Sequence, residues 1–112
     1  MQLQTLTHDV SQLEANLCNA FVDPTRLLIL YALREQPHNV TQLAIELGIP
    51  QSTTSRHLKV LRDHGLVRTT RHGVTITYEL SDNRLIEALN ILRAVLRDQI
   101  SHKANMVSES KE

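Results

Sequence analysis

The sequence predicts a mainly α-helical fold with one small β-hairpin (α+β), and two observations carry that prediction. Apolar residues recur every three or four positions through most of the 112 residues, as the buried stripe of a helix requires. Between Val67 and Leu80 the period changes to two, which is the alternation of a half-buried strand. We expect one domain over residues 1–102, followed by a polar, aperiodic and disordered tail over residues 103–112.

Two helices are expected before Pro37. The first should run from about Asp9 to Phe21, with its apolar stripe at Val10, Leu13, Leu17 and Phe21. The second should begin at Asp23 and Pro24, because Asp accepts bonds from the first-turn N–H groups and Pro lacks a donor that would have no partner there. It should end before Pro37, because proline disfavours a helical residue ahead of it.

Two short helices and a tight turn are expected next. Asn39 can cap the first of them together with Gln42, in a variant of the capping box, and Gly48 is suited to the left-handed end of that helix. The second should run from about Gln51 to His64, with Leu58 and Leu61 facing inward. Two short helices joined in this way form a helix-turn-helix candidate.

A hairpin and a long helix complete the expected order. Residues 67–70 should pair with residues 74–80 across a turn at Arg71-His72-Gly73, and the last helix should run from Ser81 or Asp82 to about His102. Its apolar residues cover more than one stripe: Leu85, Ile86, Leu89, Ile91, Leu92, Val95, Leu96 and Ile100. A single small core cannot bury all of them, so we expect a homodimer in a winged helix-turn-helix fold with extra terminal helices.

The charge distribution favours one surface that faces nucleic acid. The whole chain is neutral, with twelve Lys and Arg against twelve Asp and Glu. Residues 51–80 contain five basic and two acidic residues, a net charge of +3 with histidines uncounted. A locally positive and globally neutral chain is typical of a domain with a single phosphate-facing surface.

The second helix of the candidate motif and the hairpin carry the residues that we expect to contact duplex DNA. An α-helix fits the major groove, and short hydroxyl, amide and cationic side chains suit base edges and phosphates. The hairpin tip can reach the neighbouring minor groove or its phosphates. The predicted contacts are Gln51, Ser52, Thr53, Ser55, Arg56, His57, Lys59, Arg68, Arg71 and His72.

Three segments closely resemble the ArsR/SmtB family of dimeric repressors, whose members leave the operator when an inducer binds. They are residues 23–30 (DPTRLLIL), residues 51–67 (QSTTSRHLKVLRDHGLV) and Arg71-His72-Gly73 before the alternating strand. The resemblance covers roughly residues 17–96 and implies that the helix from Gln51 reads DNA while the first and last helices form the dimer. It also implies an inverted-repeat operator as partner. One departure is Pro50, which stands where many members have a capping Ser.

The family's usual metal sites are absent from this sequence. Members with an arsenic or cadmium site carry a Cys-x-Cys-like pair where this chain has residues 39–43 (NVTQL), and Asp82-Asn83-Arg84 replaces the Asp-x-His of members with a zinc, cobalt or nickel site. We therefore predict no standard metal cofactor. One non-standard site remains as an alternative, with Asp98 and His102 of the last helix and His8 from a partner.

Cys18 is the only cysteine, so an intramolecular disulfide is excluded. It is either a small hydrophobe at the edge of the first helix or a sensor thiol that an oxidant or a persulfide modifies. The candidate inducers are therefore a thiol oxidant, a persulfide, a metal, haem or an organic ligand.

Other function classes fit less well. The chain has no nucleophile elbow, phosphate-binding loop or paired-carboxylate motif, so we do not expect an enzyme. A winged-helix module that binds proteins instead of DNA is the main alternative. No apolar run approaches a membrane span and the polar start is unlike a signal peptide, so we expect a soluble cytoplasmic protein.

Overall fold

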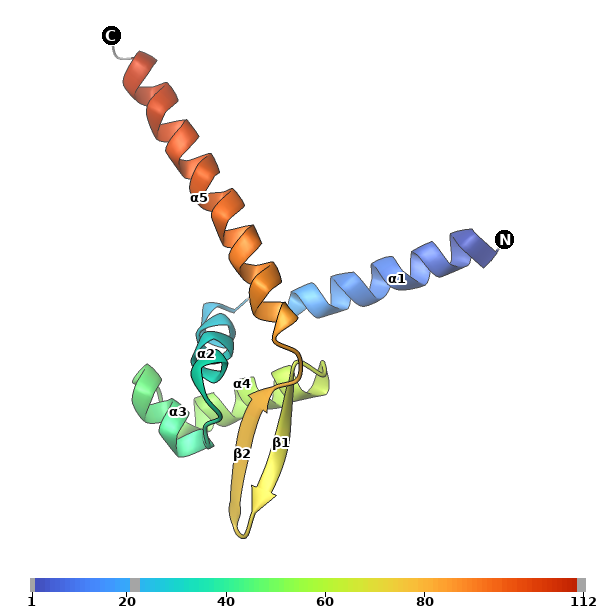
Figure 1. Cartoon of the computed structure of the whole chain (residues 1–112), viewed down its shortest axis with the longest axis vertical. Helices are drawn as coiled ribbons and strands as arrows, with labels where there is room; N and C mark the ends of the chain where they lie inside the picture. Colours follow the sequence, from blue (N-terminus) through green and yellow to red (C-terminus); the bar gives the residue numbers. More distant parts are fainter. Residues whose placement is uncertain (1, 21–22, 111–112) are drawn as a thin grey trace. The chain divides into compact units, whose positions relative to one another are not determined.

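The computed structural model describes residues 2–20 and 23–110, in two compact units that divide after Asp82. The first unit holds four helices and a two-stranded sheet, and the second holds one helix (Figure 1). The elements are α1 (Gln2–Asn19), α2 (Pro24–Glu35), α3 (Val40–Leu47), α4 (Gln51–Asp63), β1 (Val67–His72), β2 (Thr75–Leu80) and α5 (Arg84–Ser110). The expected order of helices and strands is confirmed.

The core of the first unit lies among α2, α3 and α4, which contact one another. Its completely buried large side chains are apolar apart from Thr54: Ile29, Leu30, Leu43, Leu58 and Leu61. Each full burial of such a side chain contributes roughly 1.5–3 kcal/mol relative to an exposed position. The sheet packs on the same helices, since β2 contacts α2 and α3 while β1 contacts α4.

The predicted caps fix where α2 and α3 begin. The carboxylate of Asp23 accepts a 2.7 Å bond from the backbone N–H of Thr25, and Pro24 is the first helical residue. At the start of α3, Asn39 and Gln42 each accept from the other's backbone N–H at 2.8 Å, which completes the capping box. These bonds satisfy N–H groups that the first helical turn leaves without a partner.

The turn between α3 and α4 depends on a left-handed glycine. Gly48 has φ +67°, a conformation that costs a residue with a Cβ about 1–2 kcal/mol. The backbone N–H of Ile49 then reaches the carbonyl of Ala44 at 3.1 Å and closes the helix end. The chain therefore changes direction at Gly48, between α3 and α4.

The hairpin turn lies one residue further along than the sequence suggested. β1 pairs antiparallel with β2 from Val67 opposite Leu80 to His72 opposite Thr75, so the two-residue loop is Gly73-Val74. The expected turn at residues 71–73 is wrong in this respect, because a two-residue loop with Gly first, here at φ +64°, suits the twist of paired strands. Arg71 and His72 therefore end β1 and do not form the loop.

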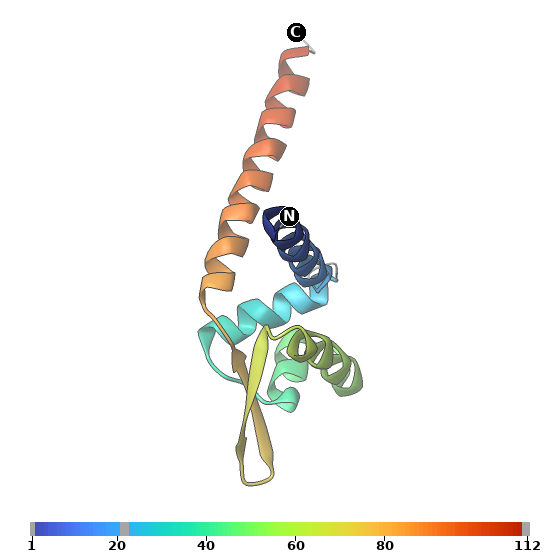
Figure 2. The ribbon, with the colours of Figure 1, turned by 90° about the vertical axis from the view of Figure 1, so that its right-hand side faces the viewer.

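The buried residue His38 ties the hairpin to the helices. Its backbone pairs with Tyr78 in both directions, at 3.1 Å and 2.8 Å. Its ring Nδ1 lies 2.7 Å from the carbonyl of Gln36, and its Nε2 lies 2.7 Å from a carboxylate oxygen of Glu46. Beyond this anchor the hairpin projects away from α2, α3 and α4 in both views (Figures 1 and 2).

The terminal helices are both longer than expected. α1 begins at Gln2 and ends at Asn19, whereas α5 continues to Ser110, past the end near His102 and through most of the predicted tail. Residues 103–110 contain neither Gly nor Pro, so nothing in the sequence stops the helix there. Phe21, at the end of the expected first helix, and residues 111–112 of the expected tail lie outside the described residues.

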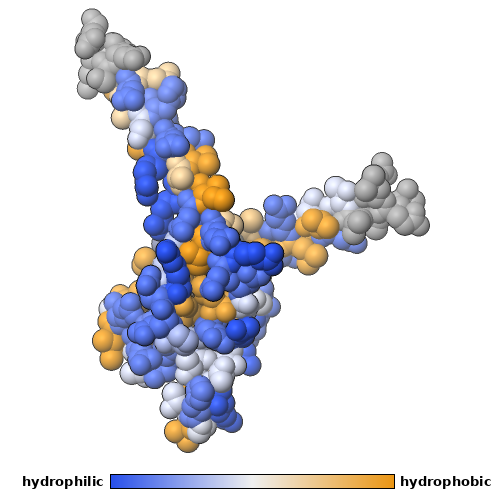
Figure 3. All heavy atoms as spheres, viewed as in Figure 1, coloured by the Kyte–Doolittle hydropathy of each residue, from blue (hydrophilic) through white to orange (hydrophobic). Residues whose placement is uncertain are grey.

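Both terminal helices carry apolar side chains that are largely exposed, and Figure 3 shows apolar surface along each. On α1, Val10 is 54% and Leu13 69% exposed. On α5 the exposed apolar residues are Ile91, Leu92, Val95, Leu96, Ile100, Met106 and Val107. None of the described helices has the length and apolar character that crossing a membrane requires.

Candidate nucleic-acid interface

One side of α4 is polar and exposed. The side chains of Gln51, Ser52, Ser55, Arg56 and Lys59 are exposed, and Thr53 is half-buried. Pro50 precedes the helix and provides no side-chain cap, so the first-turn N–H groups receive no bond from its side chain. Side chains and N–H groups of this kind at a helix start are suited to phosphate oxygens and base edges.

The opposite side of α4 is buried, and it includes one residue that we expected to contact DNA. Thr54, His57, Leu58 and Leu61 form the buried stripe. His57 is only 6% exposed, so its imidazole does not lie on the polar face with Arg56. The expectation for His57 is therefore corrected: its ring faces the N-terminal end of α2.

His57 lies against two charged residues of the α2 start. Nη1 of Arg26 is 3.4 Å from Nδ1 of His57, and a carboxylate oxygen of Asp23 is 3.9 Å from Nε2. Arginine can only donate, so a hydrogen bond from Arg26 requires Nδ1 as the acceptor, and Nε2 is the ring nitrogen that faces Asp23. The backbone bond from Thr25 is the main cause that lowers the pKa of Asp23, with smaller contributions from His57 and Arg26.

Arg26 also reaches the end of α1. Its Nε donates to the carbonyl of Ala20 at 2.7 Å, and its Nη2 donates to the carbonyl of Asn19 at 3.4 Å. No pattern in the sequence indicated a role for Arg26. The spacing of Thr54, His57, Leu58 and Leu61 at positions i, i+3, i+4 and i+7 was the signal that could have placed His57 inward and directed attention to its neighbours.

Of the four lysine and arginine side chains that we expect to contact DNA, two form ion pairs with carboxylates of the described residues and two do not. Lys59 pairs with Asp63 at 3.0 Å, and Arg68 pairs with Glu79 across the hairpin at 2.7 Å. Arg56 and Arg71 are exposed, and neither has an ion-pair partner within residues 2–20 and 23–110. An exposed guanidinium without a partner keeps all five donors for an external anion.

A hydroxyl-rich hollow of about 380 Å³ connects the polar side of α4 with the hairpin. It is lined by Ser55 of α4, Thr41 of α3, and Thr75 and Tyr78 of β2, together with four other residues. The polar side of α4 and the hairpin therefore border the same hollow, with Arg56 on the helix and Arg71 and His72 near the hairpin tip.

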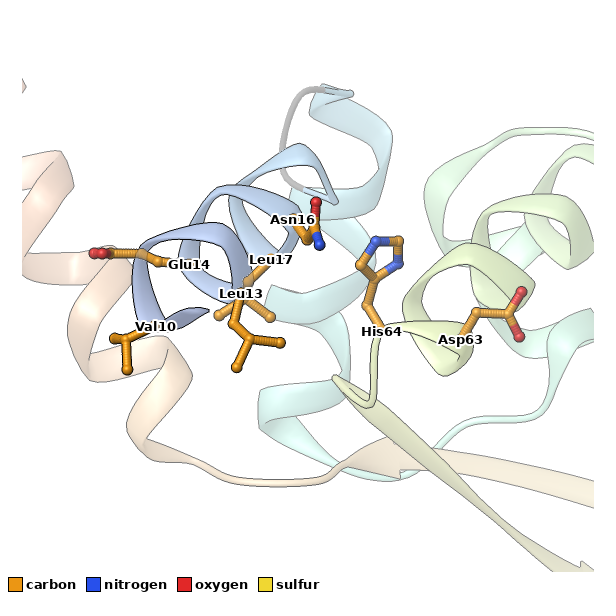
Figure 4. A pocket seen from close by; sticks show the side chains of 7 residues that line it. All are labelled: Val10, Leu13, Glu14, Asn16, Leu17, Asp63 and His64. Atoms are coloured by element: carbon orange, nitrogen blue, oxygen red, sulfur yellow. The ribbon is translucent and has the colours of Figure 1, made fainter. Parts of the chain in front are cut away.

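A second hollow, of about 670 Å³, lies between α1 and the end of α4. Val10, Leu13 and Leu17 give it an apolar wall on the α1 side. Figure 4 shows Asn16 and His64 facing each other across it, while the carboxylates of Glu14 and Asp63 point away. This wall includes the exposed apolar residues of α1 described above, Val10 and Leu13.

The remaining candidate residues lie on the terminal helices, His8 and Cys18 on α1 and Asp98 and His102 on α5. Cys18 on α1 is an exposed free thiol, and His8, Asp98 and His102 are each exposed. Over the part of the chain that the structure describes, no three His, Cys, Asp or Glu side chains come together as a possible metal site.

The sequence matches known regulators over its central part. The profile of the bacterial regulatory proteins of the ArsR family matches residues 23–69. The HTH-type transcriptional regulator NmtR of Mycobacterium tuberculosis is 42% identical over 76 residues, which are 68% of this chain and 63% of NmtR. The transcriptional repressor SmtB homolog of Synechocystis is 33% identical over 95 residues, which are 85% of this chain and 70% of that protein.

The fold matches solved structures over a longer range. The homodimeric winged helix-turn-helix DNA-binding domain of Mb0332 from Mycobacterium bovis superimposes with a TM-score of 0.76, covering 86% of this chain and 89% of that one at 23% identity. The helices α2, α3 and α4 and the hairpin thus form a winged helix-turn-helix fold. The chain belongs to the ArsR/SmtB family of DNA-binding transcriptional regulators.

Proposed function

We propose that this chain represses transcription as a homodimer that binds an inverted-repeat operator and leaves it when an inducer binds. The observation that carries the proposal is the exposed polar side of α4, which we take as the recognition helix, beside the hairpin, which we take as the wing. It includes the guanidinium groups of Arg56 and Arg71, which form no ion pair within residues 2–20 and 23–110. The name of the Synechocystis relative, a transcriptional repressor, supports repression as the outcome.

The recognition helix provides the base-reading element. An α-helix with its side chains is about 10–12 Å wide and enters a major groove of similar width. Gln51, Ser52 and Ser55 on the first turns would face the groove, with Arg56 directed to a base edge or a phosphate. Arg71 and His72 on the wing would meet the adjacent backbone, and Lys59 and Arg68 would exchange their present carboxylate partners for phosphates.

Salt dependence distinguishes this proposal from the protein-interaction alternative. The logarithm of the affinity should fall with the logarithm of salt concentration at about −0.9 for each phosphate neutralised, so about six contacts in a dimer give a slope near −5. Fluorescence anisotropy with the upstream DNA of the gene, measured from about 50 to 200 mM salt, provides the slope. A chain that bound no DNA in a genome-wide operator search would contradict the proposal and favour a protein partner.

The exposed apolar side chains of α5 support the dimer. Ile91, Leu92, Leu96 and Ile100 are between 50% and 70% exposed, and a soluble monomer rarely presents so continuous an apolar stripe. Two protomers that cover these stripes would place two recognition helices in successive major grooves, about 34 Å apart.

Leu96→Glu is expected to shift the dimer toward monomer, because a carboxylate buried in an apolar interface has lost its hydration. Gln99→Glu adds the same charge at another exposed position of α5 and is the matched control. Sedimentation velocity at micromolar concentration should show a dimer for the wild type and the control. A wild-type monomer, or a fully dimeric Leu96→Glu variant, would contradict the assignment of this surface.

The exposed thiol of Cys18 supports an inducer that reacts with sulfur. An oxidant or polysulfide added to the protein–DNA complex should release the DNA from the wild type and leave the Cys18→Ser complex intact, because serine lacks the reactive sulfur. Anisotropy of the labelled operator follows the release. Equal release from both proteins would exclude Cys18 as the sensor, and release from neither would direct the search to metals, haem and organic ligands.

A further inference from the structure

We propose that Arg26 is a positioning residue that couples the C-terminal end of α1 to the recognition helix through His57. The inference rests on the proposed function, since it concerns how α4 is held for DNA binding. Arg26 lies on α2 and is half-buried, so it stands between the two helices without being part of the exposed polar surface.

On one side, Arg26 binds the carbonyl of the last residue of α1 and that of the residue after it. Its Nε donates to Ala20 at 2.7 Å and its Nη2 to Asn19 at 3.4 Å. Carbonyls at a helix end have no partner within the helix, and a guanidinium there is favoured by both hydrogen bonding and the helix dipole. The position of the C-terminal end of α1 is thereby linked to the position of the Arg26 side chain.

On the other side, the same guanidinium holds the inner face of α4. Nη1 lies 3.4 Å from Nδ1 of His57, and the neighbouring Asp23 faces Nε2 from 3.9 Å. His57 is next in sequence to Arg56, which lies on the exposed face. The contacts of the buried His57 ring therefore fix the inner side of the same helix turn that presents Arg56 on its exposed side.

The planar guanidinium makes this double contact possible. It presents donors in a rigid fork, so one group can serve carbonyls of α1 and the imidazole of α4 at the same time. A lysine ammonium is a point charge and cannot span both partners in this geometry. Helix α1 bears Cys18 and the exposed apolar stripe. A displacement of its C-terminal end would be transmitted through Arg26 and His57 to the DNA-binding face of α4.

The first test measures operator affinity for Arg26→Gln, His57→Leu and the double variant. We expect each single variant to bind about tenfold more weakly, within the usual range of coupling between sites, and the double variant to bind no more weakly than the weaker single one. The salt slope should stay at the wild-type value, because no phosphate contact is removed. A slope lowered by about 1 for each Arg26 lost would instead identify Arg26 as a phosphate contact and overturn the inference.

Two further variants distinguish an effect of the guanidinium geometry of Arg26 from an effect of its positive charge. Arg34→Gln removes an exposed positive charge from the same helix and should bind as the wild type does. Arg26→Lys keeps the charge and should bind as weakly as Arg26→Gln. Wild-type affinity in Arg26→Lys would show that charge alone suffices, which contradicts the coupling. Circular dichroism and thermal unfolding confirm that each compared variant is folded.

The second test measures whether α1 senses DNA through Arg26. In the wild type, saturating operator should slow amide hydrogen exchange in the last turn of α1, and in Arg26→Gln at saturating operator this slowing should be lost. Persistent slowing in the variant would show that α1 responds by another route. If the wild type itself binds no operator, the proposed function fails; if it binds and the Arg26 variants match it, only this inference fails.

Discussion

Arg56→Ala is expected to weaken operator binding by about 30-fold or more. An arginine that contacts a base or phosphate contributes about 1–3 kcal/mol, and a dimer loses two of them. Arg56 is exposed on the polar side of α4, and the substitution breaks no ion pair within the described residues. The loss should therefore appear in DNA affinity, measured by anisotropy, with the unfolding temperature unchanged.

Arg62→Ala is the matched control for this prediction. Arg62 is an exposed arginine in the last turn of the same helix, six residues further on and therefore on another side. It should bind the operator with nearly wild-type affinity. Equal affinities for Arg56→Ala and the wild type would remove α4 from the DNA interface as described.

Leu43→Ala is expected to lower the free energy of unfolding by about 2–5 kcal/mol. Leu43 is completely buried where α3 meets the other core helices, and its truncation leaves a cavity that the surrounding side chains fill only in part. Because the total stability of a small domain is about 5–15 kcal/mol, this substitution removes a large share of it. Chemical denaturation with a two-state fit measures the change.

Ile45→Ala, two residues further along α3, is the matched control. Its side chain is 76% exposed, so the same reduction in size should change the free energy of unfolding by no more than about 0.5 kcal/mol. A similar loss in both variants at the same protein concentration would mean that Ile45 is covered in the folded protein, and the assignment of the α3 faces would be wrong.

The sequence predicted local features well where chemistry within a few residues decides the structure. Asp23, Asn39 with Gln42, and Gly48 each act within one helical turn, and all of them take the expected places. The change of hydrophobic period after residue 66 predicted the hairpin for the same reason.

The incorrect predictions concern features of the structure that distant residues determine, or for which two sequence signals disagree. Histidine is a residue type that suits DNA contact, but the spacing of His57 from Thr54, Leu58 and Leu61 places it on the buried stripe. The two residues that contact its ring, Asp23 and Arg26, lie at the start of α2. The role of Arg26 depends on contacts with α1 and α4 that no local pattern reveals. The end of α5 was misplaced because polarity and missing periodicity were taken as signs of disorder, although they do not prevent a helix.

The backbone pairing of His38 with Tyr78 bears on the order in which the fold can form. Helices α2, α3 and α4 are contiguous in the chain and can associate after closing only short loops, whereas pairing residue 38 with residue 78 closes a much longer loop at a greater cost in conformational entropy. The hairpin should therefore dock late in folding and separate early in local unfolding. Its tip would then adjust to the DNA backbone at little energetic cost to the helices that hold α4.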